Sequence, residues 1–519
     1  MTRTQRGTLA ATGLGLFMIF LDALIVNVAL PDIGTAFDVG ESGLQWMVTA
    51  YSLAMAASMM TGATVADRWG RKHLYVAGLA VFVAASVACG LAPSIAVLNA
   101  ARAVQGLAAA AVNVTSLALV SAAFSDPDLK ARAIGIWSAI AAIGVALGPT
   151  LGGVLTEAFG WRSVFFVNLV FGVAALALTL AYVVESRSDA PRGFDLPGQI
   201  LYVVAVGAFA LAAIEAPQVG WTSPTVAGGI VVCGAALGAF VWWELRTAEP
   251  MMDVRLFRNL TYTLAIVTIF VTMFSVYGML LLISQLWQDV LAYSVLTTGM
   301  LLLPLAVIQT ITSPIAGRLV ATVGARRLVL LGLTLLSTAL AIQAIGIGIS
   351  EAVVAVGVAI VGAGQAFTMT PATAVARGAV PEDRAGMASG ILSSQRALGS
   401  TAGYAICGSI LVAWLTATLG PSLDAVIPDE TEREAVATVI IERVNPRAYS
   451  AEIGPERPLP GASSATREEI AAAAEAEFRA GTRLALAFAA AALFVVLIVD
   501  WRVIPPDRPR RAGAVAAET

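Results

Sequence analysis

Two ionisable side chains interrupt apolar stretches of this sequence, and they are the residues best suited to chemistry. Asp22 lies within the apolar run 8–30, and Arg102 separates two uncharged runs, 73–101 and 103–125. A buried carboxyl exchanges protons near neutral pH when desolvation disfavours its charged form, and a nearby arginine opposes that effect. The two residues could therefore form a proton switch or a fixed structural ion pair.

Other reactive side chains are few. The single histidine, His73, flanks a basic turn, where we expect it to face water. Cys89, Cys233 and Cys407 lie far apart inside apolar runs, which indicates packing and not a metal site or a disulfide. No nucleotide-binding P-loop, nucleophile elbow or HExxH motif is found. The sequence thus predicts neither an enzyme nor an ATP-driven pump, and it implies no cofactor.

The segments that carry these residues are apolar over most of their length. The chain has 519 residues, of which 58% are hydrophobic and 13% are charged, and its mean hydropathy of +0.83 excludes a soluble globular protein. Twelve uncharged windows are each long enough to cross a bilayer as a helix of about 20 residues: 42–66, 73–101, 103–125, 133–156, 163–184, 196–214, 216–243, 259–288, 290–317, 328–350, 352–376 and 397–423.

Residues 8–30 and 484–499 bring the expected number of transmembrane helices to fourteen. We therefore predict an all-α polytopic membrane protein, because in lipid only a helix or a closed barrel satisfies its own backbone. Basic residues gather in alternate loops, which predicts that both termini are cytoplasmic. On this topology Asp22 and Arg102 lie roughly 13 Å and 10 Å below the outer surface at 1.5 Å per residue, so they could pair.

Two parts of the sequence repeat each other. The turn Ala63–Lys72 resembles the turn 317–327, each centred on a glycine, Gly70 or Gly324. Repeated halves around a central site are typical of secondary transporters. We expect six helices in 1–186, a linker with two inserted helices in 187–258, five helices in 259–417, a long outer loop in 418–482, a last helix in 483–501 and a cytoplasmic tail in 502–519.

The outer loop 418–482 is more acidic than basic. Asp429–Arg443 and Arg467–Arg483 are typical of polar or amphipathic helices, and the second is expected to continue into the last span. The loop could be a solvated hairpin or an element that binds a partner.

Four motifs occur in order along the first half. They are Leu21–Pro31, Ala63–Lys72, the LxxxRxxQG pattern in Leu98–Gly106, and the GxxxGPxxGG pattern in Gly144–Gly153. Together they resemble the fourteen-helix drug:proton antiporter branch of the major facilitator superfamily, the EmrB/QacA subfamily. The resemblance covers essentially the whole chain.

This resemblance implies export of structurally diverse drugs in exchange for protons, with Asp22 and Arg102 as the coupling pair. It implies a cytoplasmic gate formed by Asp67, Arg68, Gly70, Arg71 and Lys72, with the aspartate at a helix end of the opposite half; the basic residues could instead only set the topology. It also implies that an antiporter motif, formed by Gly144, Gly148, Pro149, Gly152 and Gly153, bends and seals the fifth span. Small residues at this spacing also favour simple close helix packing.

Polar residues inside other spans are candidates for a large, mainly apolar substrate cavity: Asn27, Tyr51, Gln105, Asn113, Gln285, Gln309 and Gln365. Each could instead make an interhelical hydrogen bond. Such a cavity suits amphipathic or cationic drugs, and the resemblance suggests tetracycline or spectinomycin, with no nucleic acid partner. It also implies a monomer in the bacterial plasma membrane.

Alternative functions remain open from the sequence. A transporter of the same fold could instead transport a single endogenous metabolite. Only Asp22 and the GPxxGG motif favour drug antiport over this alternative function. A receptor or scaffold has the outer loop as its only support. Arg396, inside the thirteenth span, needs a buried acceptor and could be structural or take part in coupling, and Glu215 is expected at the membrane boundary.

Overall fold

The computed structural model describes residues 1–39, 41–187, 193, 195–380, 385–443 and 464–503, and within these ranges every regular element is a helix. The α-helices are α1 (Arg3–Phe37), α2 (Glu41–Trp69), α3 (Arg71–Gly90), α4 (Ile95–Ala123), α5 (Pro127–Phe159), α6 (Ser163–Tyr182), α7 (Leu196–Val219), α8 (Pro224–Glu244), α9 (Leu260–Gln285), α10 (Val295–Val323), α11 (Ala325–Gly346), α12 (Glu351–Gly378), α13 (Ala385–Leu423), α14 (Glu430–Arg443) and α16 (Ser464–Val503). A 3₁₀ turn, η1 (Val254–Arg258), precedes α9, and a π turn, η2 (Leu286–Val290), follows it.

Short polar side chains start several of these helices. Ser94 accepts a hydrogen bond from the backbone of Val97 at the start of α4. Asp126 does the same for Leu129 of α5, directly before Pro127. Such caps satisfy backbone N–H groups that have no partner within the helix, so the helix starts are fixed by local sequence.

Thirteen helices in the described part of the chain are long and apolar enough to cross a membrane. The predicted span that is missing from these thirteen is 42–66. It corresponds to α2, which has 29 residues. Its apolar run is diluted by hydroxyl side chains such as Thr49, Ser52 and Ser58. The all-helical membrane fold is confirmed, whereas the count of fourteen spans stays a prediction.

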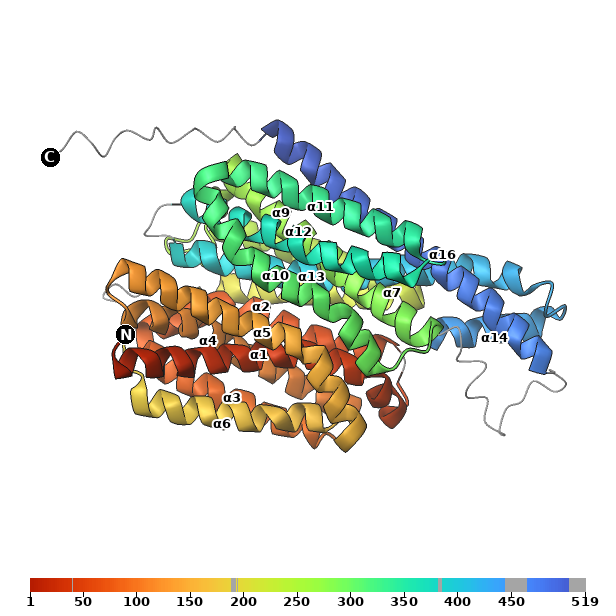
Figure 1. Cartoon of the computed structure of the whole chain (residues 1–519), viewed down its shortest axis with the longest axis horizontal. Helices are drawn as coiled ribbons and strands as arrows, with labels where there is room; N and C mark the ends of the chain where they lie inside the picture. The colour runs from red at the N-terminus through yellow and green to blue at the C-terminus, as the bar shows by residue number, and fades with distance from the viewer. Residues whose placement is uncertain (40, 188–192, 194, 381–384, 444–463, 504–519) are drawn as a thin grey trace.

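The long helices pack as two bundles (Figure 1). In the first, α1 packs against α5 and α6, and α4 packs against α2 and α3. In the second, α9 packs against α12, α13 and α16, and α12 against α10 and α11. The bundles meet where α2 contacts α13 and α5 contacts α10, while the α7–α8 hairpin lies against α2 and α13.

The long outer loop predicted between 418 and 482 contains the two helices expected within it: α14 matches the predicted helix 429–443, and the predicted helix 467–483 is continuous with the last span in α16. α13 continues to Leu423, beyond the expected end of its bundle at 417, and α16 already begins at Ser464. The extensions pack with α14 around a small apolar core that includes Leu419, Ile440 and Ile470. They project from one end of the molecule (Figure 1). Residues 444–463, the tail from 504 and Arg384 lie outside the described residues.

The start of α1 and the end of α16 lie at the same end of the molecule, opposite α14 (Figure 1). This is the arrangement that an even number of spans requires. The outward faces of the helices carry exposed apolar side chains, for example Val170 on α6 and Val231 on α8, which in a membrane face lipid.

Candidate functional site

Asp22 and Arg102 are in contact inside the first bundle. Arg102 Nη1 lies 2.6 Å from Asp22 Oδ2, and the two side chains are 1% and 0% exposed. Asp22 comes from α1 and Arg102 from α4. The pairing that their similar depths made feasible is therefore present in the structure.

Two amide side chains complete the hydrogen bonding of this carboxylate. Gln105 Nε2, one turn beyond Arg102 on α4, donates to Asp22 Oδ1 at 3.0 Å, and Asn168 Nδ2 of α6 donates to the same oxygen at 2.6 Å. Arg102 Nη1 also donates to Gln105 Oε1 at 2.8 Å. A carboxyl that only accepts hydrogen bonds is in its ionised form. Helices α4 and α6 thus direct donors at both carboxylate oxygens of Asp22.

Asn168 was not among the residues predicted from the sequence. It is fully buried, and its Nδ2 also lies 3.0 Å from Ser86 Oγ of α3, which donates to the Phe165 carbonyl. Its Oδ1 has no hydrogen-bond partner. A signal was present, because an amide within the uncharged run 163–184 needs a polar partner in a dry interior. The partner could not be identified without the packing of α6 against α1.

The rest of the Arg102 guanidinium is also enclosed. Nε donates to the Met47 carbonyl at 3.4 Å, and Cζ lies 4.3 Å from the centre of the Tyr51 ring, a cation–π arrangement. The Tyr51 hydroxyl donates to the Ile19 carbonyl on α1 at 3.0 Å. Tyr51 and Gln105, predicted to line a substrate cavity, therefore belong to this buried network.

Glycines of the predicted antiporter motif allow α5 to lie directly against α1. A Cβ placed on Gly144 would lie 2.6 Å from the Phe17 carbonyl oxygen, and one placed on Gly152 would lie 2.7 Å from the Ile25 carbonyl oxygen. Real Cβ atoms essentially never approach other atoms this closely. The two contact points lie on either side of Asp22, so the motif sets the position of the segment that carries the acid.

The same helix also meets the second bundle. Pro149, inside α5, lies next to Gly299 of α10, where an added Cβ would be 3.5 Å from the proline Cβ. Gly148 abuts Leu24, and Gly153 is buried. α5 thus connects the helix that carries Asp22 to the interface between the bundles, which is more than ordinary packing within one bundle.

The turn between α2 and α3 carries the predicted cytoplasmic gate. Arg71 Nη2 lies 3.1 Å from Asp67 Oδ1, and Arg68 is exposed. Gly70 has φ of +111°, a backbone conformation that favours glycine. Within the described residues, the ion pair of Asp67 is therefore local. The contact with a helix end of the opposite half stays a prediction, because 381–384 lie outside the described residues.

Glu185, after α6, fastens this turn and was not predicted. Its carboxylate accepts hydrogen bonds from the backbone N–H groups of Lys72 at 2.9 Å and His73 at 3.1 Å, at the start of α3, and from Ser186. Burial acts to raise the pKa of Glu185, but these three backbone donors outweigh it and hold the pKa below its usual range. The His73 ring also contacts it, Nδ1 to Oε2 at 2.5 Å.

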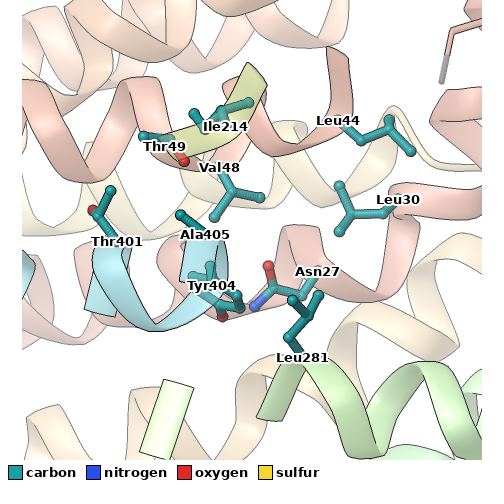
Figure 2. A pocket seen from close by; sticks show the side chains of 10 residues that line it. All are labelled: Asn27, Leu30, Leu44, Val48, Thr49, Ile214, Leu281, Thr401, Tyr404 and Ala405. Carbon is teal, nitrogen blue, oxygen red and sulfur yellow. The ribbon is translucent and has the colours of Figure 1, made fainter. Parts of the chain in front are cut away.

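A small pocket lies between the two bundles (Figure 2). Figure 2 shows Asn27 of α1 pointing toward Tyr404 of α13, to which it is hydrogen-bonded, with Leu281 of α9 beside them. The Tyr404 ring stacks edge-on against Tyr277, with centroids 5.6 Å apart. The cavity measures about 30 Å³, far below the ~300–1,000 Å³ of small-molecule sites. In this arrangement the bundles are closed around it.

Of the seven predicted cavity residues, Asn27 is the one that lines this pocket. Asn113, Gln285 and Gln309 are half-buried on α4, α9 and α10, and Gln365 is buried on α12. A role for these four residues in a substrate cavity stays a prediction.

Arg396 and Glu215 have polar partners. Arg396 Nη2 donates to Thr373 Oγ1 of α12 at 2.8 Å, while its Nε has none. Glu215 Oε1 accepts a hydrogen bond from Trp46 Nε1 at 3.1 Å, which links α7 to α2. Arg396 was expected to need a buried hydrogen-bond acceptor, and the hydroxyl of Thr373 is that acceptor.

Two helical bundles with a small pocket between them, and a buried ion pair in the first, are the architecture of a membrane transporter. The sequence model of the Major Facilitator Superfamily matches residues 12–404. The chain belongs to this superfamily.

Relatives within the family have known roles. The Multidrug resistance protein Stp of Mycobacterium tuberculosis (strain CDC 1551 / Oshkosh) is 53% identical over 509 residues, 98% of this chain and 93% of that protein. The Drug efflux pump JefA of the same strain is 42% identical over 506 residues, 97% and 99% of the two chains. A bacterial homologue of the human lysosomal transporter Spinster, solved inward-facing and unoccupied, shares the fold, with a TM-score of 0.62, 17% identity and coverage of 97% and 98%.

Proposed function

We propose that this chain is a proton-coupled antiporter that exports structurally diverse drugs by alternating access, with Asp22 as the proton carrier. The observation that carries the proposal is the carboxylate of Asp22, fully buried and bonded only by donors from α4 and α6. The relatives Stp and JefA, a multidrug resistance protein and a drug efflux pump, support the substrate class.

Protonation of Asp22 changes the forces between three helices at once. A neutral carboxyl loses the charge-assisted bond to Arg102, and its new O–H faces a group of donors. Because α5 and α10 connect α1 to the second bundle, a shift of α1 reaches the interface. We infer that proton binding from outside permits the return to the inward-facing state, and that proton release inside favours drug capture.

The closed pocket at Asn27 and Tyr404 fits one stage of such a cycle, since a drug enters only after the bundles separate. Amphipathic or cationic compounds suit its apolar lining and few polar groups, and tetracycline and spectinomycin are the first to test. We place both termini in the cytoplasm of a bacterial cell and the α14 region outside. One proton carries about 2.3 kcal/mol per 100 mV of membrane potential, besides the pH gradient.

The test is uptake of tetracycline and spectinomycin into inside-out vesicles that contain the wild-type protein, Asp22→Asn or Asp32→Asn. Asp32 lies on the same helix but is exposed, so it is the matched control. We expect the wild type and Asp32→Asn to accumulate drug until an uncoupler is added, and Asp22→Asn to show no uncoupler-sensitive uptake. Retention of coupled uptake by Asp22→Asn excludes Asp22 as the carrier. Transport of a single metabolite, with no drug in a broad panel, overturns the proposed substrate class.

A further inference from the structure

A second buried carboxyl lies in the other bundle, at Asp500 of α16. Its side chain is 0% exposed. Thr268 Oγ1 of α9 donates to Oδ2 at 2.8 Å, whereas Oδ1 has no hydrogen-bond partner among the residues that the structure describes. Thr268 lies eight residues into α9, about 12 Å from its start at 1.5 Å per residue. The carboxyl is therefore inside the bundle.

The surroundings of Asp500 differ from those of Asp22. Asp22 has a guanidinium and two amides, whereas one hydroxyl is the only hydrogen-bond partner of Asp500 in the described part of the chain. An ionised carboxylate in a dry interior without a paired cation costs several kcal/mol. Within the described residues, an ionised Asp500 therefore lacks the compensating cation that Asp22 has.

The charged and titratable groups on the packed helices have other partners or positions. Arg326 of α11 donates to the carbonyl of Trp501, Arg396 of α13 donates to Thr373, and Arg502 of α16 is exposed. On α9 the hydroxyl of Tyr262 is buried without a hydrogen-bond partner. No ion pair joins Asp500 to a neighbour in the ranges that the structure describes.

Hydroxyl side chains extend from Asp500 along α9. Thr268, Thr272 and Ser275 are spaced four and three residues apart, so they share one face of the helix. Thr268 bonds Asp500, and Ser275 Oγ donates to the Ala489 carbonyl, also on α16. All three are fully buried, and Thr272 Oγ1 has no partner. Buried hydroxyl and carboxyl oxygens without partners are positions where water and protons can be accommodated.

Each acid lies between the first and last helices of its own bundle, but at a different depth: Asp22 is 19 residues into α1 and Asp500 is three residues before the end of α16. Asp22 lies between the first and sixth helices of its bundle, bonded by Asn168 of α6. Asp500 lies between α9 and α16, the first and last helices of the second bundle. Each bundle therefore has one fully buried carboxyl between its first and last helices.

We propose that Asp500 is a second proton-exchanging carboxyl of the transport cycle, and that the hydroxyls of Thr268, Thr272 and Ser275 lead to it. The proposal rests on the proton coupling proposed above. Asp500 binds one proton in the state described here and releases it when α9 and α16 separate and the site is hydrated. The cycle then moves two protons, one for each bundle.

The first experiment needs no drug. Infrared difference spectra of the reconstituted protein between pH 5 and 8 detect protonated carboxyl groups. We expect a carboxylic acid band in the wild-type spectrum that is absent from the spectrum of Asp500→Asn. Thr268→Val keeps the acid but removes its hydrogen-bond donor, so it should shift the frequency of this band. If Asp500→Asn does not fold, Asp500→Glu serves instead, because it retains the acid and shifts the band. A wild-type spectrum without any band that these variants alter overturns the proposal.

The second experiment counts protons per drug in proteoliposomes that hold a pH-sensitive dye. The probe is tetracycline, or whichever compound showed uncoupler-sensitive uptake in the vesicle test. Asp500→Asn is expected to move one proton fewer per drug, and Asp500→Glu and the exposed control Asp32→Asn to match the wild type. An unchanged ratio in Asp500→Asn overturns the proposal. If the wild type moves no protons, the proposed function fails, while the infrared result on Asp500 still stands.

Discussion

Replacing Gly152 by alanine tests whether the glycines of α5 set the position of the helix that carries Asp22. The new methyl would lie 2.7 Å from the Ile25 carbonyl oxygen and 3.0 Å from Ile25 Cγ1, whereas ordinary contacts begin at 3.4 Å. α1 and α5 must therefore separate locally by about 0.7 Å. Overpacking of this kind costs ~1–3 kcal/mol, and the better helix propensity of alanine returns up to ~1 kcal/mol.

Gly135 supplies the matched control, because it lies on the same helix and an added Cβ meets nothing within 4 Å. Gly135→Ala has only the propensity gain, so Gly152→Ala should be about 1–3 kcal/mol less stable than Gly135→Ala. Unfolding of the two purified variants in the same detergent measures this difference, and drug uptake into vesicles measures function. The displacement should also loosen the 2.6 Å bond from Arg102 to Asp22 and reduce coupled uptake. Equal stability and equal uptake in the two variants would refute the reasoning.

Two further substitutions test the groups that the sequence did not reveal. Asn168→Leu removes a hydrogen-bond donor to Asp22 while keeping a similar side-chain volume. We expect the free energy of unfolding in detergent to fall by ~1.5–3 kcal/mol, and uncoupler-sensitive uptake to weaken. Wild-type values in both measurements would show that Asn168 does not support the carboxylate. Glu185→Gln tests the turn before α3. Because the folded pKa of Glu185 is lowered, its charge stabilises the fold above the ordinary value of about 4.3, and this stability is lost as the pH falls through the lower folded value. Glu185→Gln should therefore unfold at a lower temperature than the wild type at pH 7, with the gap closing below about pH 4; a gap independent of pH between 3 and 7 would contradict this.

Part of the candidate site could be identified from the sequence because charge is rare in lipid-spanning segments. Asp22 and Arg102 stood out against uncharged runs, and their depths followed from the rise of a helix. Asn168 and Glu185 did not stand out, since an amide in a span and an acid after one are common. Their importance comes from contacts with residues more than a hundred positions away in the chain.

The pocket between the bundles shows the same limit. Tyr51 and Gln105 were predicted to line a substrate cavity, but they turn toward Arg102, while Tyr404 faces Asn27 across the bundle interface. In a soluble helix the apolar stripe reveals which face is buried. In a membrane both lipid and protein interior are apolar, so the sequence pattern says little about how a helix is rotated about its axis.

The sequence alone therefore determined that the chain is a helical membrane protein, roughly where its spans lie, and that Asp22 and Arg102 lie within them, because these follow from the cost of exposing polar groups to lipid. Tertiary structure decided which side chains meet: Asn168 with Asp22, Glu185 with the start of α3, Thr268 with Asp500, and the glycines of α5 with the backbone of α1. These contacts depend on the rotation and separation of neighbouring helices, which are set by side-chain shape over many residues and not by the local balance of apolar and charged residues.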